Sequence, residues 1–215
     1  MRRLFILLGA VLAAGLPGSA VRAQEAASRW DSVEVLVPSR GLDSIRTDRE
    51  AYARLRGEAD ARAGTARLRL AEVEDLLEQI KGEFQSVDGR IKAAKDAKNE
   101  PDKTVAEAEK KRLERQRTVL ERRRDLRSAE MDEARAESEY AAAAVRALDL
   151  EYQLERRRQD GAEPAVRSEL EKKTLEAEND MASRAESLAG RRTRIAERRR
   201  ALSEAQYELI RIRRG

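Results

Sequence analysis

The chain has 215 residues, with 45 lysines and arginines against 41 aspartates and glutamates, and it contains neither histidine nor cysteine. This composition excludes a histidine proton shuttle, a thiol nucleophile and the usual zinc ligands, and the sequence has no glycine-rich phosphate loop. Because 40% of the residues are charged and 3% are aromatic, long helices that share a narrow seam are favoured over a broad globular core. We therefore expect a protein that is not an enzyme, with no catalytic, cofactor-binding or metal-binding residues.

Residues 1–23 have the pattern of a cleaved secretory signal peptide. Two arginines precede the apolar run Leu4–Leu16, and the triplet Val21-Arg22-Ala23 precedes a cleavage position before Gln24. A second cleavage position follows Ala20. An uncleaved anchor is the alternative, but the run is shorter than the roughly 20 residues that a spanning helix needs. We expect a periplasmic or secreted protein that keeps no transmembrane anchor of its own.

Removal of the signal peptide also changes the charge of the chain. Three arginines and no acids lie in residues 1–23, so 42 basic residues would remain against 41 acidic ones. A net charge near zero and so few aromatic side chains give little attraction to nucleic-acid phosphates or bases. The sequence predicts no nucleic-acid partner.

Residues 24–41 form an N-terminal arm ahead of the first helix. Within the arm, residues 32–37 alternate apolar and polar side chains as a short strand would, and Pro38 and Gly41 follow. Two interpretations remain open: a strand that adds to a partner's sheet, or a lead-in that packs on the helices.

A heptad pattern predicts the first helix over residues 42–98. One row of uncharged residues recurs every seven positions: Ile45, Tyr52, Ala59, Ala66, Val73, Ile80, Val87 and Ala94. A second row starts at Leu42 and includes Arg49 and Arg56. A polar disordered chain would not keep this phase for over fifty residues, so the pattern indicates a coiled-coil seam.

Two breaks divide the helical region into three segments. At the first break, Asn99 and Pro101 are typical of a helix start, and residues 104–107 have the spacing of a capping box. At the second break, Gly161 and Pro164 combine a stop with a restart. The sequence predicts an all-α fold, a long antiparallel coiled coil in the form of an elongated three-helix bundle over residues 42–215, with helices at 42–98, 102–158 and 163–213.

The two later helices have weaker seams. In the second, one row holds Met131, Ser138, Val145 and Tyr152, and another holds Ala134, Ala141 and Leu148. In the third, an apolar row holds Met181, Leu188, Ile195, Leu202 and Leu209. Arg184, Arg191 and Arg198 occupy its companion row, which indicates either an edge helix or a seam that another chain completes.

Charge predicts the register of the folded-back helices. An antiparallel hairpin places Glu72–Glu83 beside residues 118–129, so that Glu74, Asp75 and Glu78 face Arg122, Arg123 and Arg124. The second turn places Glu133, Glu137 and Glu139 opposite Arg184 and Arg192. If both turns hold, Arg191 and Arg198 approach the same acidic stretch of the first helix. Chance coincidence of charge runs is one alternative, and a third helix that pairs with another molecule is the second.

These features favour an exported structural or adaptor rod of the bacterial cell envelope, with other envelope proteins or a second copy as partners. The long hairpin and short possible strand of residues 33–158 resemble the layout of the Skp/OmpH periplasmic chaperones, and this resemblance implies a holdase for unfolded envelope proteins as the alternative. The third helix and the near-zero mature charge depart from that layout. The arginine runs 122–124 and 198–200 also suit an anionic envelope polymer or lipid, although pairing with internal acids is favoured.

Overall fold

The computed structural model describes Val37 and residues 39–214. These residues form three helices, α2 (Leu42–Asp96), α3 (Glu100–Gln159) and α4 (Pro164–Arg214), which account for 94% of them. No strand occurs in this part of the chain. The predicted all-α helical bundle is thereby confirmed. The predicted signal peptide and most of the predicted strand at 32–37 lie outside the described residues.

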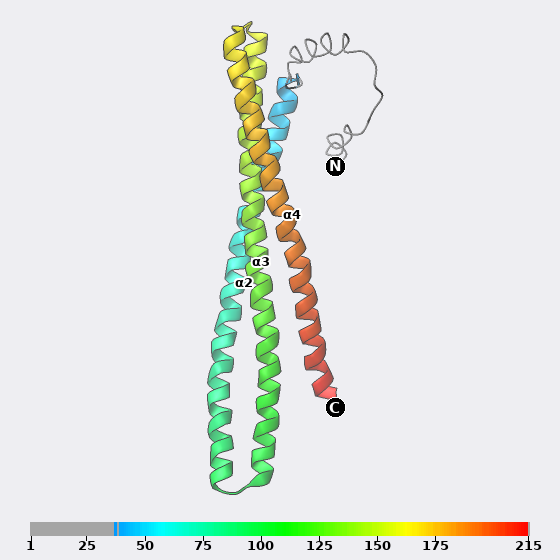
Figure 1. Ribbon diagram of the computed structural model, residues 1–215. Coiled ribbons are helices and arrows are strands. Elements are labelled where there is room, and N and C mark those ends of the chain that lie inside the picture. Colours follow the sequence, from blue (N-terminus) through cyan, green and yellow to red (C-terminus); the bar gives the residue numbers. More distant parts are fainter. Residues whose placement is uncertain (1–36, 38, 215) are drawn as a thin grey trace, which may run out of the picture. The chain divides into compact units, whose positions relative to one another are not determined.

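The three helices pack as two antiparallel pairs that share α3. Helix α3 packs against α2 and against α4, whereas α2 and α4 do not pack against each other (Figure 1). The expectation that residues 191–200 would flank the acidic stretch of α2 was therefore wrong. The physical reason is that α3 lies between the other two helices and supplies the seam for both.

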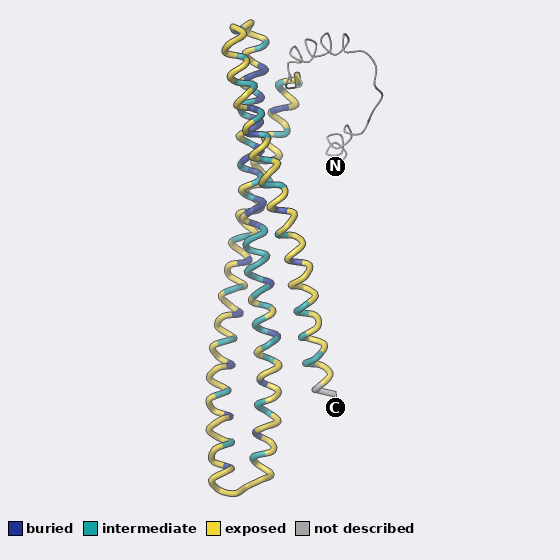
Figure 2. The backbone as a smooth tube through the Cα atoms, viewed as in Figure 1, coloured by how far each residue is buried: buried dark blue, intermediate teal, exposed yellow. Residues whose placement is uncertain are grey.

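The heptad row predicted for α2 lies in its seam. Seven of its eight members are buried, from Ile45 to Ala94, and Tyr52 is half-buried. Arg49 and Arg56, in the second row, are exposed. Figure 2 shows the resulting burial along the inner side of α2 and the exposed residues on its outer side. A single apolar stripe therefore stabilises this 55-residue helix by packing on one neighbour.

Burial on α3 is concentrated in its C-terminal half, where both other helices contact it. Small and apolar side chains are buried on more than one face there, including Ala134, Ala136, Ala141, Ala143, Ala144, Ala147, Leu148 and Leu154. Alanine allows the helix backbones to approach closely. Nearer the hairpin tip, a smaller cluster of Val87, Ala106 and Leu113 packs with Phe84 and Ile91.

The turn between α2 and α3 is shorter than the sequence predicts. Helix α2 ends at Asp96, Lys98 adopts a left-handed conformation with φ 53°, and Asn99 caps α3 by accepting a hydrogen bond from the Asp102 amide at 3.2 Å. The capping-box interpretation of residue 104 was wrong. Thr104 lies inside α3, where its hydroxyl donates to the Glu100 carbonyl, because the asparagine side chain already satisfies the first turn.

At the second turn, Gly161 has φ 68° and Pro164 begins α4. Only glycine reaches this left-handed conformation without steric cost. Among the described residues, no helix is long and apolar enough to cross a membrane.

Candidate functional site

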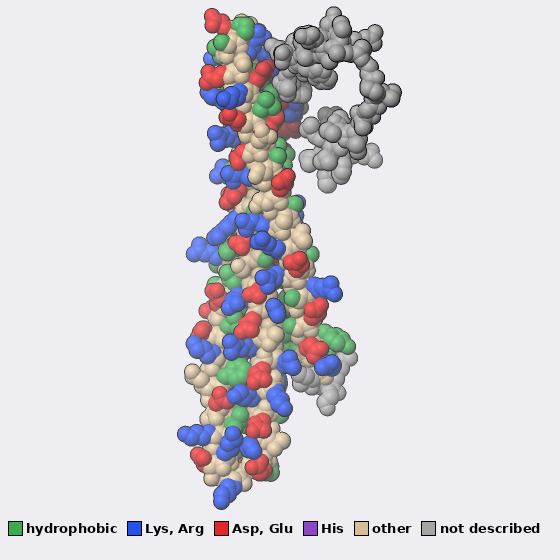
Figure 3. All heavy atoms as spheres, viewed as in Figure 1, with side chains coloured by type: hydrophobic (Ala, Val, Ile, Leu, Met, Phe, Trp, Pro, Cys, Tyr) green, Lys and Arg blue, Asp and Glu red, His purple; other side chains and the backbone are tan. Residues whose placement is uncertain are grey.

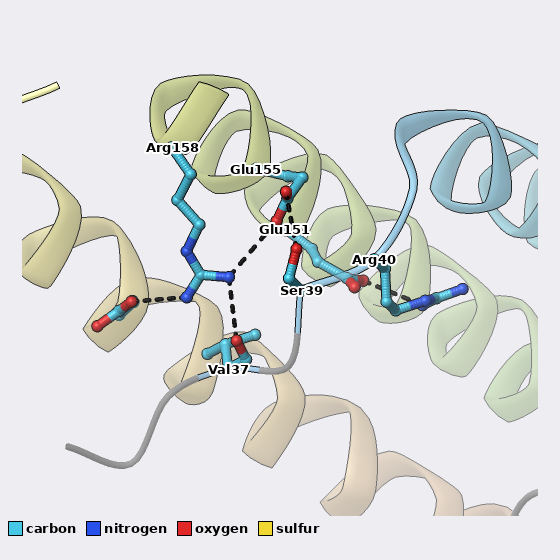
Figure 4. Close-up of polar contacts among 7 residues, drawn as sticks. Val37, Ser39, Arg40, Glu151, Glu155 and Arg158 are labelled. Atoms are coloured by element: carbon cyan, nitrogen blue, oxygen red, sulfur yellow. Dashed lines mark hydrogen bonds and ion pairs between the residues drawn. The ribbon is translucent and has the colours of Figure 1, made fainter. Parts of the chain in front are cut away.

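A polar cluster fastens the arm to the end of the bundle opposite the hairpin tip (Figure 4). The Val37 side chain is buried, and its carbonyl accepts a hydrogen bond of 3.0 Å from Arg158. Ser39 donates to Glu155 at 2.9 Å, and Arg158 also pairs with Glu171 of α4 at 2.7 Å. One arginine of α3 therefore connects the arm with α4. This favours a lead-in that packs on the helices, as far as the arm is described.

Arg40 and Arg46 extend the same cluster along α2. The Arg40 guanidinium pairs with Glu151 of α3 at 3.2 Å and with Asp48. Arg46 donates a hydrogen bond of 2.7 Å to the Tyr152 hydroxyl and lies 5.2 Å from the centre of its ring. These contacts fix where α2 begins relative to α3.

Two carboxyl groups near this end have perturbed acidity. Burial raises the pKa of Glu151, and the neighbouring charge of Glu178 on α4 raises it further, while Arg40 opposes the shift. Burial also raises the pKa of Glu178 itself. The described residues contain no group of acidic side chains that is suited to hold a metal ion. The arrangement therefore supports a packing role for these carboxylates.

Glu137 joins all three helices. Its side chain is buried, and it pairs with Arg62 of α2 and, at 3.1 Å, with Arg192 of α4. Nearby, Tyr52 and Tyr140 meet edge to face with ring centres 5.9 Å apart. Burial, followed by a hydrogen bond with Tyr52, raises the pKa of Tyr140. The chain thus spends its few aromatic residues at the level where three helices meet.

The predicted register of α4 on α3 is observed. Arg192 pairs with Glu133 at 3.1 Å and Arg184 pairs with Glu139 at 3.3 Å. Further towards the C-terminus, Arg198 pairs with Asp125 at 3.5 Å. The arginines in the companion row of α4 therefore serve, at positions 184 and 198, as partners of α3 acids. Arg191 is half-buried, and its Nε atom has no hydrogen-bond partner.

The predicted register of α2 on α3 brings opposite charges near each other without ion pairs. Glu74 and Glu78 line a surface groove of about 600 Å³ with Arg117 and Arg124 of α3. No arginine forms an ion pair with Glu74, Asp75 or Glu78 within the described part of the chain, and Glu78 pairs only with Lys81 of its own helix. Arg122 and Arg123 likewise form no ion pair there. Arg124 pairs with Asp125.

A second groove lies on the hairpin where α4 approaches its end. Leu76 and Ile80 of α2, Leu113 and Val119 of α3, and Leu209 of α4 contribute apolar lining. Leu202 and Leu209 are half-buried, whereas Leu188 and Ile195 are buried. The seam of α4 is therefore looser towards its C-terminus, where the helix diverges from α3 in Figure 1.

Sequence reasoning missed two connecting residues. Asp125 was not singled out, although the second fold-back places it opposite Arg198. Arg158 lies in the run Arg156-Arg157-Arg158, and no local signal distinguishes it from its neighbours. Figure 3 shows why such signals are weak, because basic and acidic side chains are interspersed over the visible face.

No known protein family, curated protein or solved structure matches the chain. The functional argument therefore depends on the residues and their geometry alone.

Proposed function

We propose that the protein is an exported, non-enzymatic coiled-coil rod that acts as a structural or adaptor component of the bacterial cell envelope. One observation carries the proposal. Helix α4 covers α3 over its C-terminal half, whereas the hairpin tip consists of α2 and α3 alone. The ion pairs near the tip, such as Arg90 with Glu109 at 2.7 Å and Lys110 with Asp88 at 2.8 Å, join these two helices.

Long helices clamped at one end are suited to spacing and docking. A helix of 55 residues has a length of about 80 Å at 1.5 Å per residue. The polar cluster around Arg158 ties the arm, α3 and α4 together at one end, and the tip lies at the other end of the hairpin. Partners would bind along the exposed faces or at the tip.

A periplasmic holdase is the rival proposal. Such a chaperone needs an apolar inner face on its arms, beyond the residues that form the seam. The large exposed apolar side chains of the described chain are instead distributed over three helices: Leu68, Leu76, Val105, Val166, Tyr207 and Ile210. This distribution supports the rod over the holdase.

Two measurements test the proposal. Fractionation of the producing cell, followed by N-terminal sequencing, should find the protein outside the cytoplasm with a chain that begins at Gln24. In the second measurement, an outer-membrane protein is diluted from urea in the presence of a several-fold excess of this protein. The rod should leave the rate of aggregation unchanged. Retention in the cytoplasm would refute the exported role, and strong suppression of aggregation would establish the holdase instead.

A further inference from the structure

A transverse strip of charges crosses all three helices at one level of the bundle. Glu74 and Glu78 of α2 share a groove with Arg124 of α3. Arg124 pairs with Asp125 at 3.2 Å, and Asp125 pairs with Arg198 of α4 at 3.5 Å. The strip therefore has an acidic edge on α2, a mixed centre on α3 and a basic edge on α4.

The basic side of this strip lacks enough acids within the chain. Residues 122–130 of α3 and 191–200 of α4 together contain ten arginines and three acids. Asp125 is shared by Arg124 and Arg198, and Glu130 is shared by Arg127 and Arg199. Closely spaced like charges repel each other. An acidic partner at this level would relieve the repulsion.

The acidic side has the complementary deficit. The five acids of the α2 stretch, which we call the acidic segment, make no ion pair with another helix: Glu72, Glu74, Asp75, Glu78 and Glu83. They lie at the same level as the arginines of α4, but α3 separates the two helices (Figure 1). One chain therefore carries both halves of a charge match that it cannot complete by itself.

We propose that a second copy of this chain binds along the strip, with the acidic segment of each copy against residues 191–200 of the other. Because acid and base lie side by side across one face, a twofold axis parallel to the helices superposes opposite charges at both edges. A twofold axis perpendicular to the helices would superpose like charges. The dimer is therefore parallel, with both hairpin tips at the same end.

The groove supplies apolar surface between the charged edges. Leu77 and Phe84 line it, and both are half-buried. Exposed ion pairs are individually weak and are screened by salt. The dimer should accordingly be salt-sensitive, with a dissociation constant that rises about tenfold or more between 50 mM and 500 mM NaCl.

Charge reversal on separate chains tests the proposal. One variant carries E74K, D75K and E78K, and the other carries R191E, R194E and R198E. Analytical ultracentrifugation of the purified protein at 50 mM NaCl should give a dimer for the wild type and a monomer for each variant. An equimolar mixture of the two variants should again give a dimer, because opposite charges then meet at both edges. A control variant with E50K, E58K and D60K changes the charge of α2 equally and should remain dimeric.

Orientation has an independent readout, since the chain has no native cysteine. A single cysteine in place of Ala97 at the hairpin tip should form an intermolecular disulfide, and a single cysteine in place of Glu163 at the other end should do the same. Neither should link to the other position when the two variants are mixed. Links between positions 97 and 163 would overturn the parallel arrangement.

A wild-type monomer at all concentrations and at low salt would overturn the proposal. So would variants whose mixture stays monomeric while circular dichroism shows that each is helical. If reversal of both segments in one chain restored thermal stability without any change in mass, the segments would pair within the monomer. This inference goes beyond the adaptor role, because a monomeric rod would still satisfy the export and aggregation tests.

Discussion

The carboxylate of Glu137 accepts hydrogen bonds from arginines of both flanking helices. The side chain retains 9% of its exposure, whereas those of Arg62 and Arg192 retain 51% and 56%. The arginines therefore remain hydrated without their partner, but the glutamate does not. Solvent screening keeps the value of the two pairs below that of fully buried ones.

We predict that Glu137→Gln lowers the free energy of unfolding by about 1–2 kcal/mol, because the amide loses the charge that strengthens both hydrogen bonds. Urea denaturation monitored by circular dichroism measures the change. Glu139→Gln is the matched control. Glu139 is exposed and pairs with one arginine, so its loss should cost less than about 0.5 kcal/mol. Equal effects at the two positions would contradict the bridging role of Glu137.

Glu178 gives a pH-dependent prediction. Burial raises its pKa above the ordinary value of 4.5, so the folded state binds a proton at a pH where the unfolded state has released it. Stability from this group is present at low pH and is lost as pH rises through the folded pKa. Glu178→Gln should therefore raise the melting temperature at pH 7.

The benefit of Glu178→Gln should shrink as pH falls towards 4.5, since the carboxyl group becomes neutral as well. Glu151 of α3, whose partners are Arg40 and Asp48, is the group through which α3 and the arm influence this site. Glu176→Gln, at an exposed position of α4, provides the control and should leave the pH profile unchanged. A benefit that grows on acidification would reverse the assigned sign.

Individual residues were predictable where their role follows from a repeat. The α2 row from Ile45 to Ala94 required only the seven-residue period. Arg158 and Ser39 were not predictable, because their partners lie in segments far apart in the sequence. A contact of this kind depends on how the helix ends are placed, and no local pattern encodes it.

The two turns differ in how well their residues suit the backbone. Lys98 and Gly161 both adopt left-handed conformations, with φ 53° and 68°. A side chain at such a position costs roughly 1–2 kcal/mol, and glycine largely avoids this cost. Space around Gly161 is open, so the backbone conformation alone decides the effect of a substitution there.

We predict that Lys98→Gly stabilises the hairpin by about 0.5–1 kcal/mol and that Gly161→Ala destabilises the chain by about 1 kcal/mol. Thermal and urea denaturation should show the opposite signs directly. Ala97→Gly, one residue before the left-handed position, should not stabilise, because Ala97 has φ −79°. A stabilising effect of both glycine variants would contradict the explanation.

Helix existence was predictable, whereas helix ends were less so. The positions of Asn99, Pro101, Gly161 and Pro164 located both turns. The start of α3 was misplaced because Thr104 fits a capping box in sequence, while Asn99 satisfies the first turn in the fold. Two residues with capping ability compete, and the one nearer the point where α2 ends prevails.

At the scale of the whole described unit, stability should vary along α3. Its C-terminal half packs against two helices, and the half near the tip packs mainly against α2. Local unfolding requires less free energy where fewer apolar contacts are lost. Helix α4 should loosen first towards Leu209, where its seam is half-buried.

Hydrogen exchange with mass spectrometry tests this gradient. Amides of residues 134–155 should exchange slowest, and those of the tip at residues 96–102 and of α4 beyond residue 200 should exchange fastest. A pattern of uniform protection along α3 would contradict the two-pair architecture. Measurement above the salt concentration that dissociates any dimer separates the gradient from protection by a second copy.

The sequence by itself determined the three helices, the two turns and the seam face of α2. These follow from heptad spacing and from the backbone preferences of asparagine, glycine and proline, which act over a few residues. Only the tertiary structure decided that α3 is shared by both pairs, that α2 and α4 stay apart, and that the acidic segment finds no arginine within the chain. An apolar stripe shows that a face must be covered, but not which helix covers it. That choice depends on close packing between distant segments, and here the alanines of α3 permit contact on two sides.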